Sequence, residues 1–172
     1  MGPEKHLTLD ASAADFAVDM SNVMRTSPLL GDRPVDLARF TGLIMGLVAY
    51  TRDESLQVYG VADWSLLRAR DLTDGERSTL KRWYRRGLIE VLDVADDRLL
   101  ELADHTGQRV VSRDNYMEYY RTYPWIAGNR DRFFQPIPLG DAVAVSPRIM
   151  PVPEEWEISR KEEESLLLAA GM

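Results

Sequence analysis

The sequence predicts an α/β protein with a three-layer α/β/α arrangement and a mostly parallel, Rossmann-like central sheet. Short apolar runs, which are typical of buried strands, alternate along the chain with segments whose apolar residues recur at helical spacing. Such alternation is the signature of βαβ units, in which helices cover both faces of a parallel sheet. The length of 172 residues suits a single domain. We therefore expect one domain over 1–148 and an acidic C-terminal helix or tail over 149–172.

The expected elements follow one another in a regular order. Buried strands are predicted at 14–19, 55–62, 88–94 and 108–112, with short edge strands at 133–134 and 142–145. Helices are predicted at 35–50, 73–87, 95–105, 114–122 and 154–170, and a loop at 20–34. Thr73 with Glu76 three residues later forms a capping-box pattern, and Asp36 lies in a first turn. Gly87 and Gly107 are placed to end helices.

The overall charge argues against a protein that binds nucleic acid over its whole surface. The chain has 21 Lys and Arg residues against 28 Asp and Glu residues, a formal net charge of −7. The segment 151–172 holds six Glu residues and two basic residues, so much of this charge belongs to the tail. Seven basic residues lie between Arg68 and Arg86, which leaves room for a local anion-binding face.

The residue types that are missing from the chain exclude several classes of site. With 0 Cys there is no disulfide framework, thiolate zinc site or cysteine nucleophile. This composition fits a reducing compartment, and we expect a cytoplasmic location. No apolar run approaches the length that spans a bilayer, and the N-terminus lacks the apolar core of a signal peptide. We therefore expect no membrane partner.

An acidic residue follows each of the four predicted strands at the same end. Asp19 follows the first strand and Asp63 the second, and the pair Asp96 and Asp97 follows the third. Asp114 follows the fourth strand, and Glu118 comes one predicted helical turn later. Because ligands of parallel sheets bind outside the carboxyl ends of the strands, we expect these carboxylates to converge on one cleft.

Clustered carboxylates without a basic partner repel one another, and protonation or a cation relieves the repulsion. Oxygen ligands without nearby His or Cys suit a hard cation such as Mg²⁺ or Mn²⁺. Asp96 and Asp97 are adjacent, so on a helix they point about 100° apart and at most one of them aims at the centre of the cleft. The alternative reading, in which these acids serve only as helix caps, stays open at this point.

Several segments resemble, in order and spacing, PIN-like nucleases of the NYN branch. They are AVDMSNV at 17–23, ADDRLLELA at 95–103, VVSRDNY at 110–116 and RDRF at 130–133. The family named by this resemblance is that of the Regnase-type endoribonucleases, and the similarity covers roughly residues 14–140. It implies a PIN-like fold for the domain at 1–148.

The resemblance also implies a reaction and a set of site residues. It implies cleavage of RNA phosphodiester bonds by a Mg²⁺- or Mn²⁺-dependent endoribonuclease, and the RNA is expected to be single-stranded. The catalytic acids implied are Asp19, Asp96, Asp97 and Asp114, with Asp19, Asp97 and Asp114 as direct or water-bridged metal ligands and Asp96 in support. The expected substrate-binding residues are Asn22, Ser112, Arg113, Arg82, Arg85 and Arg86, and Glu118 is expected in the outer shell.

Other interpretations of the same sequence remain open. One is a toxin of a toxin–antitoxin pair with the same chemistry, and another is a catalytically inactive PIN-like module that binds without cutting. Trp83 and Tyr84, set between Arg82 and Arg85, are also candidates for stacking on a base, against the alternative of core packing. A homodimer stays open as well, as does an additional domain or partner protein that contacts the C-terminal tail.

Overall fold

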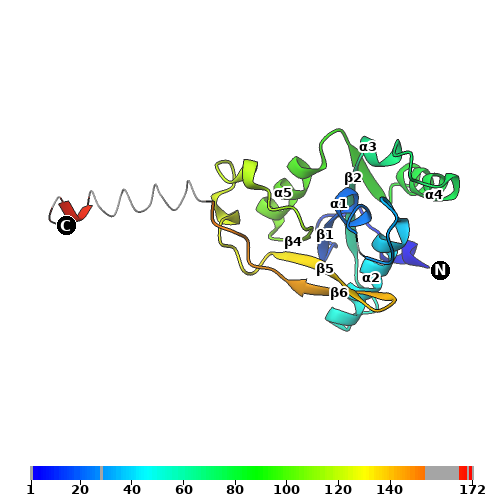
Figure 1. The fold of residues 1–172 in the computed structure, drawn as a ribbon, viewed down its shortest axis with the longest axis horizontal. Helices are drawn as coiled ribbons and strands as arrows, with labels where there is room; N and C mark the ends of the chain where they lie inside the picture. The colour runs from blue at the N-terminus through cyan, green and yellow to red at the C-terminus, as the bar shows by residue number, and fades with distance from the viewer. Residues whose placement is uncertain (1, 28, 154–166, 170, 172) are drawn as a thin grey trace.

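The computed structural model describes residues 2–27, 29–153, 167–169 and 171 of the chain. Its centre is a six-stranded sheet with the order β3-β2-β1-β4-β5-β6 (Figure 1). The first five strands in this order run parallel, and β6 pairs with β5 in the antiparallel sense. The strands are β1 (Phe16–Asp19), β2 (Val58–Asp63), β3 (Ile89–Leu92), β4 (Arg109–Val111), β5 (Phe133–Leu139) and β6 (Ala142–Pro147).

Helices connect these strands and cover both faces of the sheet. The α-helices are α1 (Met20–Met24), α2 (Leu37–Thr51), α3 (Trp64–Leu67), α4 (Asp74–Arg85) and α5 (Ala95–Thr106). Short 3-10 helices form at η1 (Pro3–His6), η2 (Met117–Tyr119) and η3 (Pro124–Ile126). Within the described ranges, no helix is both long enough and apolar enough to cross a membrane.

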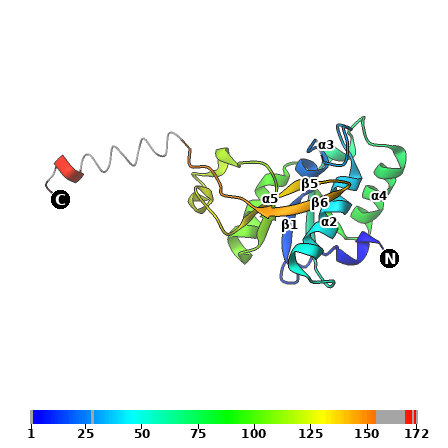
Figure 2. The ribbon, with the colours of Figure 1, turned by 60° about the horizontal axis from the view of Figure 1, so that its bottom comes forward.

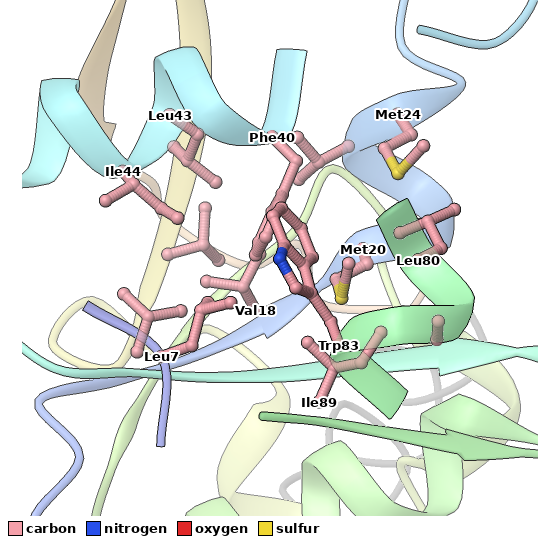
Figure 3. Close-up of a cluster of buried hydrophobic side chains, with 14 of the residues drawn as sticks. Leu7, Val18, Met20, Met24, Phe40, Leu43, Ile44, Leu80, Trp83 and Ile89 are labelled. Atoms are coloured by element: carbon pink, nitrogen blue, oxygen red, sulfur yellow. The ribbon is translucent and has the colours of Figure 1, made fainter. Parts of the chain in front are cut away.

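Side chains on the two faces of each central strand enter different cores. Phe16 and Val18 of β1 pack in a large cluster that includes residues of α1, α2 and α4, whereas Ala17 between them packs against α5. Figure 3 shows part of the larger cluster, in which Trp83 of α4 lies beside Phe40 of α2. This alternation is what a strand covered on both faces requires.

Two close approaches fix how the elements pack. The β5–β6 hairpin lies beside α2, as both ribbon views show (Figures 1 and 2). A Cβ atom at Gly46 of α2 would collide with the backbone carbonyl of Val143 in β6. Gly60 of β2 is similarly enclosed, because a Cβ atom there would lie 2.9 Å from the sulfur of Met20 and 3.3 Å from Ile89. Larger residues at either position would push the layers apart.

The local signals that predicted the longer helices are confirmed. Thr73 accepts a hydrogen bond from the Glu76 backbone N–H at 3.1 Å, while the Glu76 carboxylate accepts one from the Thr73 N–H at 3.0 Å. The Asp36 side chain caps α2, and Gly107 ends α5 with a φ of 72°. These interactions satisfy backbone groups that a helix end leaves free.

The structure differs from the sequence-based expectation in the segments 20–34, 64–67 and 114–122. The segment 20–34, expected as a loop, begins with α1, and the short helix α3 follows β2 directly. The helix expected at 114–122 does not form: it is replaced by a turn and the 3-10 helix η2, because Tyr116 adopts a left-handed φ of 51° that interrupts a helix. Most of the helix expected at 154–170 lies outside the described residues.

Candidate functional site

A buried carboxylate lies at the carboxyl end of the central strand. Asp19 ends β1 and is 3% exposed. One of its oxygens accepts a hydrogen bond from the Asn22 backbone N–H at 3.1 Å and thereby caps α1. Its Oδ2 accepts hydrogen bonds from the hydroxyls of Tyr116 at 3.1 Å and Ser112 at 3.3 Å. Burial raises the pKa of Asp19 to about 6, although these donors oppose the shift.

The turn that follows β4 brings a second carboxylate to this place. The Asp114 backbone N–H donates to the Ser112 hydroxyl at 3.1 Å, and the Asp114 carboxylate accepts from the Tyr116 N–H at 2.9 Å. The Arg113 N–H donates to the side-chain oxygen of Asn22 at 2.8 Å, which ties the turn to α1. The charge of Asp114 acts on Asp19 and raises its pKa further. The turn therefore fixes the two acids next to each other.

A third carboxylate comes from the first turn of α5. Burial raises the pKa of Asp96 to about 7, and the charges of Asp19, Asp114, Glu118 and Asp63 raise it in the same direction. No ion pair among the described residues joins Asp19, Asp96 or Asp114 to a basic side chain. We call these three residues the acid cluster. The three carboxylates lie close enough for their charges to act on one another.

Of the two adjacent acids in the first turn of α5, Asp96 is the one whose pKa is raised by burial and by the charges of Asp19 and Asp114. Asp97 was expected as a metal ligand with Asp96 in support, but Asp96 faces Asp19 and Asp114. Asp97 is exposed and lies beside the Tyr119 hydroxyl. Burial raises the pKa of Tyr119, and the neighbouring Asp97 raises it further. The buried residues Ala95 and Leu99 pack on the sheet and fix the rotation of α5, and thereby decide which of the two acids lies near Asp19.

The acid after β2 has a structural partner of its own. Asp63 caps α3 by accepting a hydrogen bond from the Leu66 N–H at 3.0 Å, and it also accepts from the Ser65 hydroxyl. Its backbone N–H donates to the Ser21 hydroxyl at 3.1 Å. Asp63 therefore joins the ends of β1 and β2, and its charge reaches Asp96. Glu118 lies in η2, not on the helical face expected for it, and acts on Asp96 through its charge.

The arginines expected on α4 do not reach the acid cluster. Arg82 and Arg86 each form an ion pair with Glu4 of η1, at 3.1 Å in both cases. Because α4 leads into β3, its C-terminal end lies toward the start of that strand, whereas the acid cluster lies at the strand ends. Arg85 is exposed at the end of α4, and Trp83 is buried and donates to Glu4 at 2.9 Å. Core packing, not base stacking, is therefore the role of Trp83.

Two other polar residues expected at the site do lie beside the acid cluster. Asn22 and Ser112 bond directly to the turn or to Asp19. Arg113 follows Ser112, and its side chain is exposed. Among the arginines expected at the site, Arg113 is therefore the one next to the acid cluster.

Sequence reasoning missed two residues that hold the site together. Tyr116 is buried, and its hydroxyl donates to Asp19. Arg148, just after β6, donates to the backbone carbonyls of Ser112 at 2.8 Å and Asp114 at 3.0 Å. Tyr116 belongs to the VVSRDNY segment, so its position could have been noticed. Nothing in the sequence around Arg148 points to a turn that is more than thirty residues away.

The acid cluster suits a hydrated hard cation better than a cage of protein ligands. Among the described residues, no three His, Cys, Asp or Glu side chains are close enough together to hold a metal ion by themselves. Mg²⁺ commonly keeps several water ligands and uses only one or two carboxylates. The repulsion that raises the pKa of Asp96 is also what a cation would relieve. The donor set therefore fits Mg²⁺ or Mn²⁺ bound partly through water.

Comparisons with known proteins find similarity in structure but not in sequence. No family model matches the chain, and no curated protein matches it. Two solved structures of the nuclear protein-only RNase P 2 (PRORP2) of Arabidopsis thaliana are similar, with TM-scores of 0.60 and 0.63. They cover 81% and 83% of this chain at 10% identity. The chain corresponds to 31% of the PRORP2 chain in each case.

The similarity to PRORP2 concerns the fold, because the sequence identity is low. A mostly parallel sheet with helices on both faces is what the sequence predicted. The predicted three-layer α/β/α fold class with a mostly parallel central sheet is therefore confirmed.

Proposed function

We propose that this chain is a divalent-metal-dependent endoribonuclease that uses the acid cluster. The observation that carries the proposal is the proximity of three carboxylates at the carboxyl edge of a parallel sheet, none of which forms an ion pair with a described basic residue. Such an arrangement destabilises the fold unless a ligand uses it, and groups with strongly perturbed pKa values often mark functional sites.

Each residue of the site has a proposed role. Asp19, Asp96 and Asp114 hold Mg²⁺ or Mn²⁺ directly or through water. Bound there, the ion supplies Lewis-acid stabilisation of the phosphate and lowers the pKa of a water molecule. Tyr116 and Ser112 orient the Asp19 carboxylate by donating to its Oδ2. The exposed Arg113 side chain contacts the RNA backbone, and Asp97 acts in the outer shell.

The choice of RNA as the substrate rests on two kinds of support. The solved structures with a similar fold are, by their titles, of an RNase P. The sequence segments around Asp19, Asp96 and Asp114 resemble Regnase-type endoribonucleases. Both point to RNA phosphodiesters, and the Regnase-type resemblance adds cleavage within a single-stranded region.

The proposal is tested with the purified full chain and labelled RNA. A single-stranded RNA, its duplex and a circular form are incubated with Mn²⁺, with Mg²⁺ or with EDTA. We expect fragments of the single strand and opening of the circle with either metal and not with EDTA. Asp19→Asn should abolish these products, whereas the exposed Asp141→Asn in the β5–β6 turn is the matched control and should keep them. Full activity of Asp19→Asn would overturn the assignment.

A second candidate function is an inactive PIN-like module that binds metal or a partner without cutting. The exposed position of Asp97 favours it, because one of the acids implied by the family resemblance faces Tyr119 and not the cluster. In this case Mn²⁺ would bind while no RNA is cleaved under any condition above. The toxin alternative predicts the same cleavage together with a small protein that co-purifies with the chain.

A further inference from the structure

Arg148 is a half-buried arginine whose side-chain hydrogen bonds all go to the turn that carries Asp114. It follows β6, and its backbone N–H donates to the Phe133 carbonyl at 2.9 Å. One guanidinium nitrogen donates to the carbonyls of Ser112 at 2.8 Å and Asp114 at 3.0 Å. The other donates to the side-chain oxygen of Asn115. A single side chain thus spans the turn from its first residue to its fourth.

The turn needs such support because it has no regular backbone pairing of its own. Residues 112–116 form neither helix nor strand, and Tyr116 holds a left-handed φ of 51°, which is uncommon outside glycine. Without Arg148, the partly buried carbonyls of Ser112 and Asp114 would lose these hydrogen bonds, which costs free energy. The planar fork of a guanidinium reaches several acceptors at once, which a lysine ammonium does not reproduce.

Burial lowers the pKa of Arg148 and the charge of Asp114 opposes this shift, so the guanidinium lies near the acid cluster. Arg148 forms no ion pair with Asp19, Asp96 or Asp114; its hydrogen bonds go to two carbonyl groups and one amide. It therefore holds the backbone of Asp114 in place while the carboxylates remain free for a cation. An arginine that paired with the carboxylates would instead compete with that cation.

The residues after Arg148 make further hydrogen bonds to the stretch between Ser112 and Asn129. The Met150 N–H donates to the Asn129 carbonyl at 2.9 Å, and Met150 is buried. The Tyr120 hydroxyl donates to the Pro151 carbonyl at 2.9 Å. We call Arg148 to Pro151 the clamp segment. It joins both ends of the stretch between Ser112 and Asn129, which contains the Asp114 turn.

We propose that Arg148 is a positioning residue: through the clamp segment it fixes the Asp114 turn in the geometry that binds the metal. This inference rests on the proposed function, since it concerns the same site. It adds that the segment leading into the C-terminal tail controls that site. A contact that pulled the clamp segment away would weaken metal binding without touching any metal ligand.

The test compares Arg148→Met and Arg148→Lys with a matched arginine in the full chain. Arg77 is the control, because it also donates to two backbone carbonyls, those of Leu67 and Ala69, but its bonds go to residues outside the acid cluster. Mn²⁺ affinity is measured by calorimetry, and RNA cleavage is measured as kcat and KM. We expect Arg148→Met to weaken Mn²⁺ binding by about tenfold or more and to lower kcat with little change in KM. Arg148→Lys should recover part of the loss.

A loss of general stability would not imitate this result. Arg77→Met should lower the Tm as Arg148→Met does, yet keep the wild-type Mn²⁺ affinity. In an Asp114→Asn background, Arg148→Met should cause no further loss of affinity, because the two residues act through one turn. Equal Mn²⁺ affinity of Arg148→Met and the wild type, or additive losses in the double variant, would overturn the inference.

The outcome separates this inference from the proposed function. If the wild-type chain binds no Mn²⁺ and Asp19→Asn changes nothing, the proposed function fails and the inference falls with it. If the wild type binds Mn²⁺ and loses it in Asp19→Asn, while Arg148→Met binds normally, only the inference on Arg148 is wrong.

Discussion

Carboxylates in two regions of this molecule have opposite environments. Between α2 and α4, Glu76 accepts hydrogen bonds from Arg33 at 2.6 Å and from the Leu37 backbone N–H at 2.7 Å. Although burial opposes the shift, these donors and Thr73 lower the pKa of Glu76 to about 2. In the acid cluster, burial raises the pKa of Asp19 to about 6. The same chemical group is stabilised as an anion in one region and destabilised in the other.

The contrast shows which acids build the fold and which are held ready for a ligand. Glu76 and Glu4 have arginine partners and join separate elements of the chain. Within the part of the chain that the structure describes, the acid cluster forms no ion pair with an arginine, and its charges repel one another. A protein keeps such an unfavourable arrangement where function requires it.

The largest effect is expected from removing the charge of Asp19. Asp19→Asn should reduce RNA cleavage by about a thousandfold or more, since a central metal ligand is lost. The Tm at about pH 7.5 should be unchanged or higher, because a buried charge that is costly to desolvate disappears. Cleavage assays and thermal unfolding of the same preparation check both parts. If Asp19→Asn were inactive because it does not fold, Asp19 would be needed for stability like Glu76, which contradicts the expected contrast between the two regions.

The next effect distinguishes the two neighbouring acids of α5. Asp96→Asn should weaken Mn²⁺ binding and cleavage by about a hundredfold, because Asp96 faces the other carboxylates. Asp97→Asn should change them by no more than about threefold, since Asp97 is exposed and lies beside Tyr119. Mn²⁺ titrations of the two variants make the measurement. The reverse ranking would return the ligand role to Asp97.

A third effect concerns the paired region. Glu76→Gln should lower the free energy of unfolding by about 2 kcal/mol, because it weakens the hydrogen bonds to Arg33 and to two backbone N–H groups. Mn²⁺ affinity should remain that of the wild type. Chemical denaturation together with calorimetry tests both statements. A loss of Mn²⁺ binding in a folded Glu76→Gln variant would show that the two regions are not independent.

The last effect is the pH dependence of stability. Because the folded pKa of Asp19 is raised, the native state binds more protons than the unfolded state between about pH 4 and pH 6. The stabilisation of the fold that Asp19 contributes is fully present below its unfolded pKa and is lost as the pH rises through its folded pKa. For Asp19 this loss is about 3 kcal/mol, and Asp19→Asn should remove it. Unfolding curves of both proteins across this pH range give the difference.

The fold was predictable because its signals are local or periodic. The capping box of Thr73 and Glu76 needs only four consecutive residues, and Gly107 ends a helix through its own backbone preference. The acids after the strands were predictable for a related reason: the carboxyl ends of parallel strands meet at one edge of the sheet.

The details of the site depend on contacts between distant residues. Tyr116 leaves the helical conformation while its hydroxyl bonds to Asp19, 97 positions away, and this interrupts the helix expected there. The choice between Asp96 and Asp97 follows from how α5 packs on the sheet. Arg148 acts on residues 34 and 36 positions earlier. No pattern within a single segment of the sequence encodes these contacts.

Calorimetric titration of the full chain with Mn²⁺ at about pH 7.5 tests the central claim most directly. We expect the wild type to bind Mn²⁺ at one site per chain, with binding lost in Asp19→Asn and retained in Glu76→Gln. Binding should also weaken toward about pH 5.5, because the raised pKa values of Asp19 and Asp96 mean that protons then compete with the ion. Absence of Mn²⁺ binding to the wild type, or equal binding to Asp19→Asn, would contradict the account.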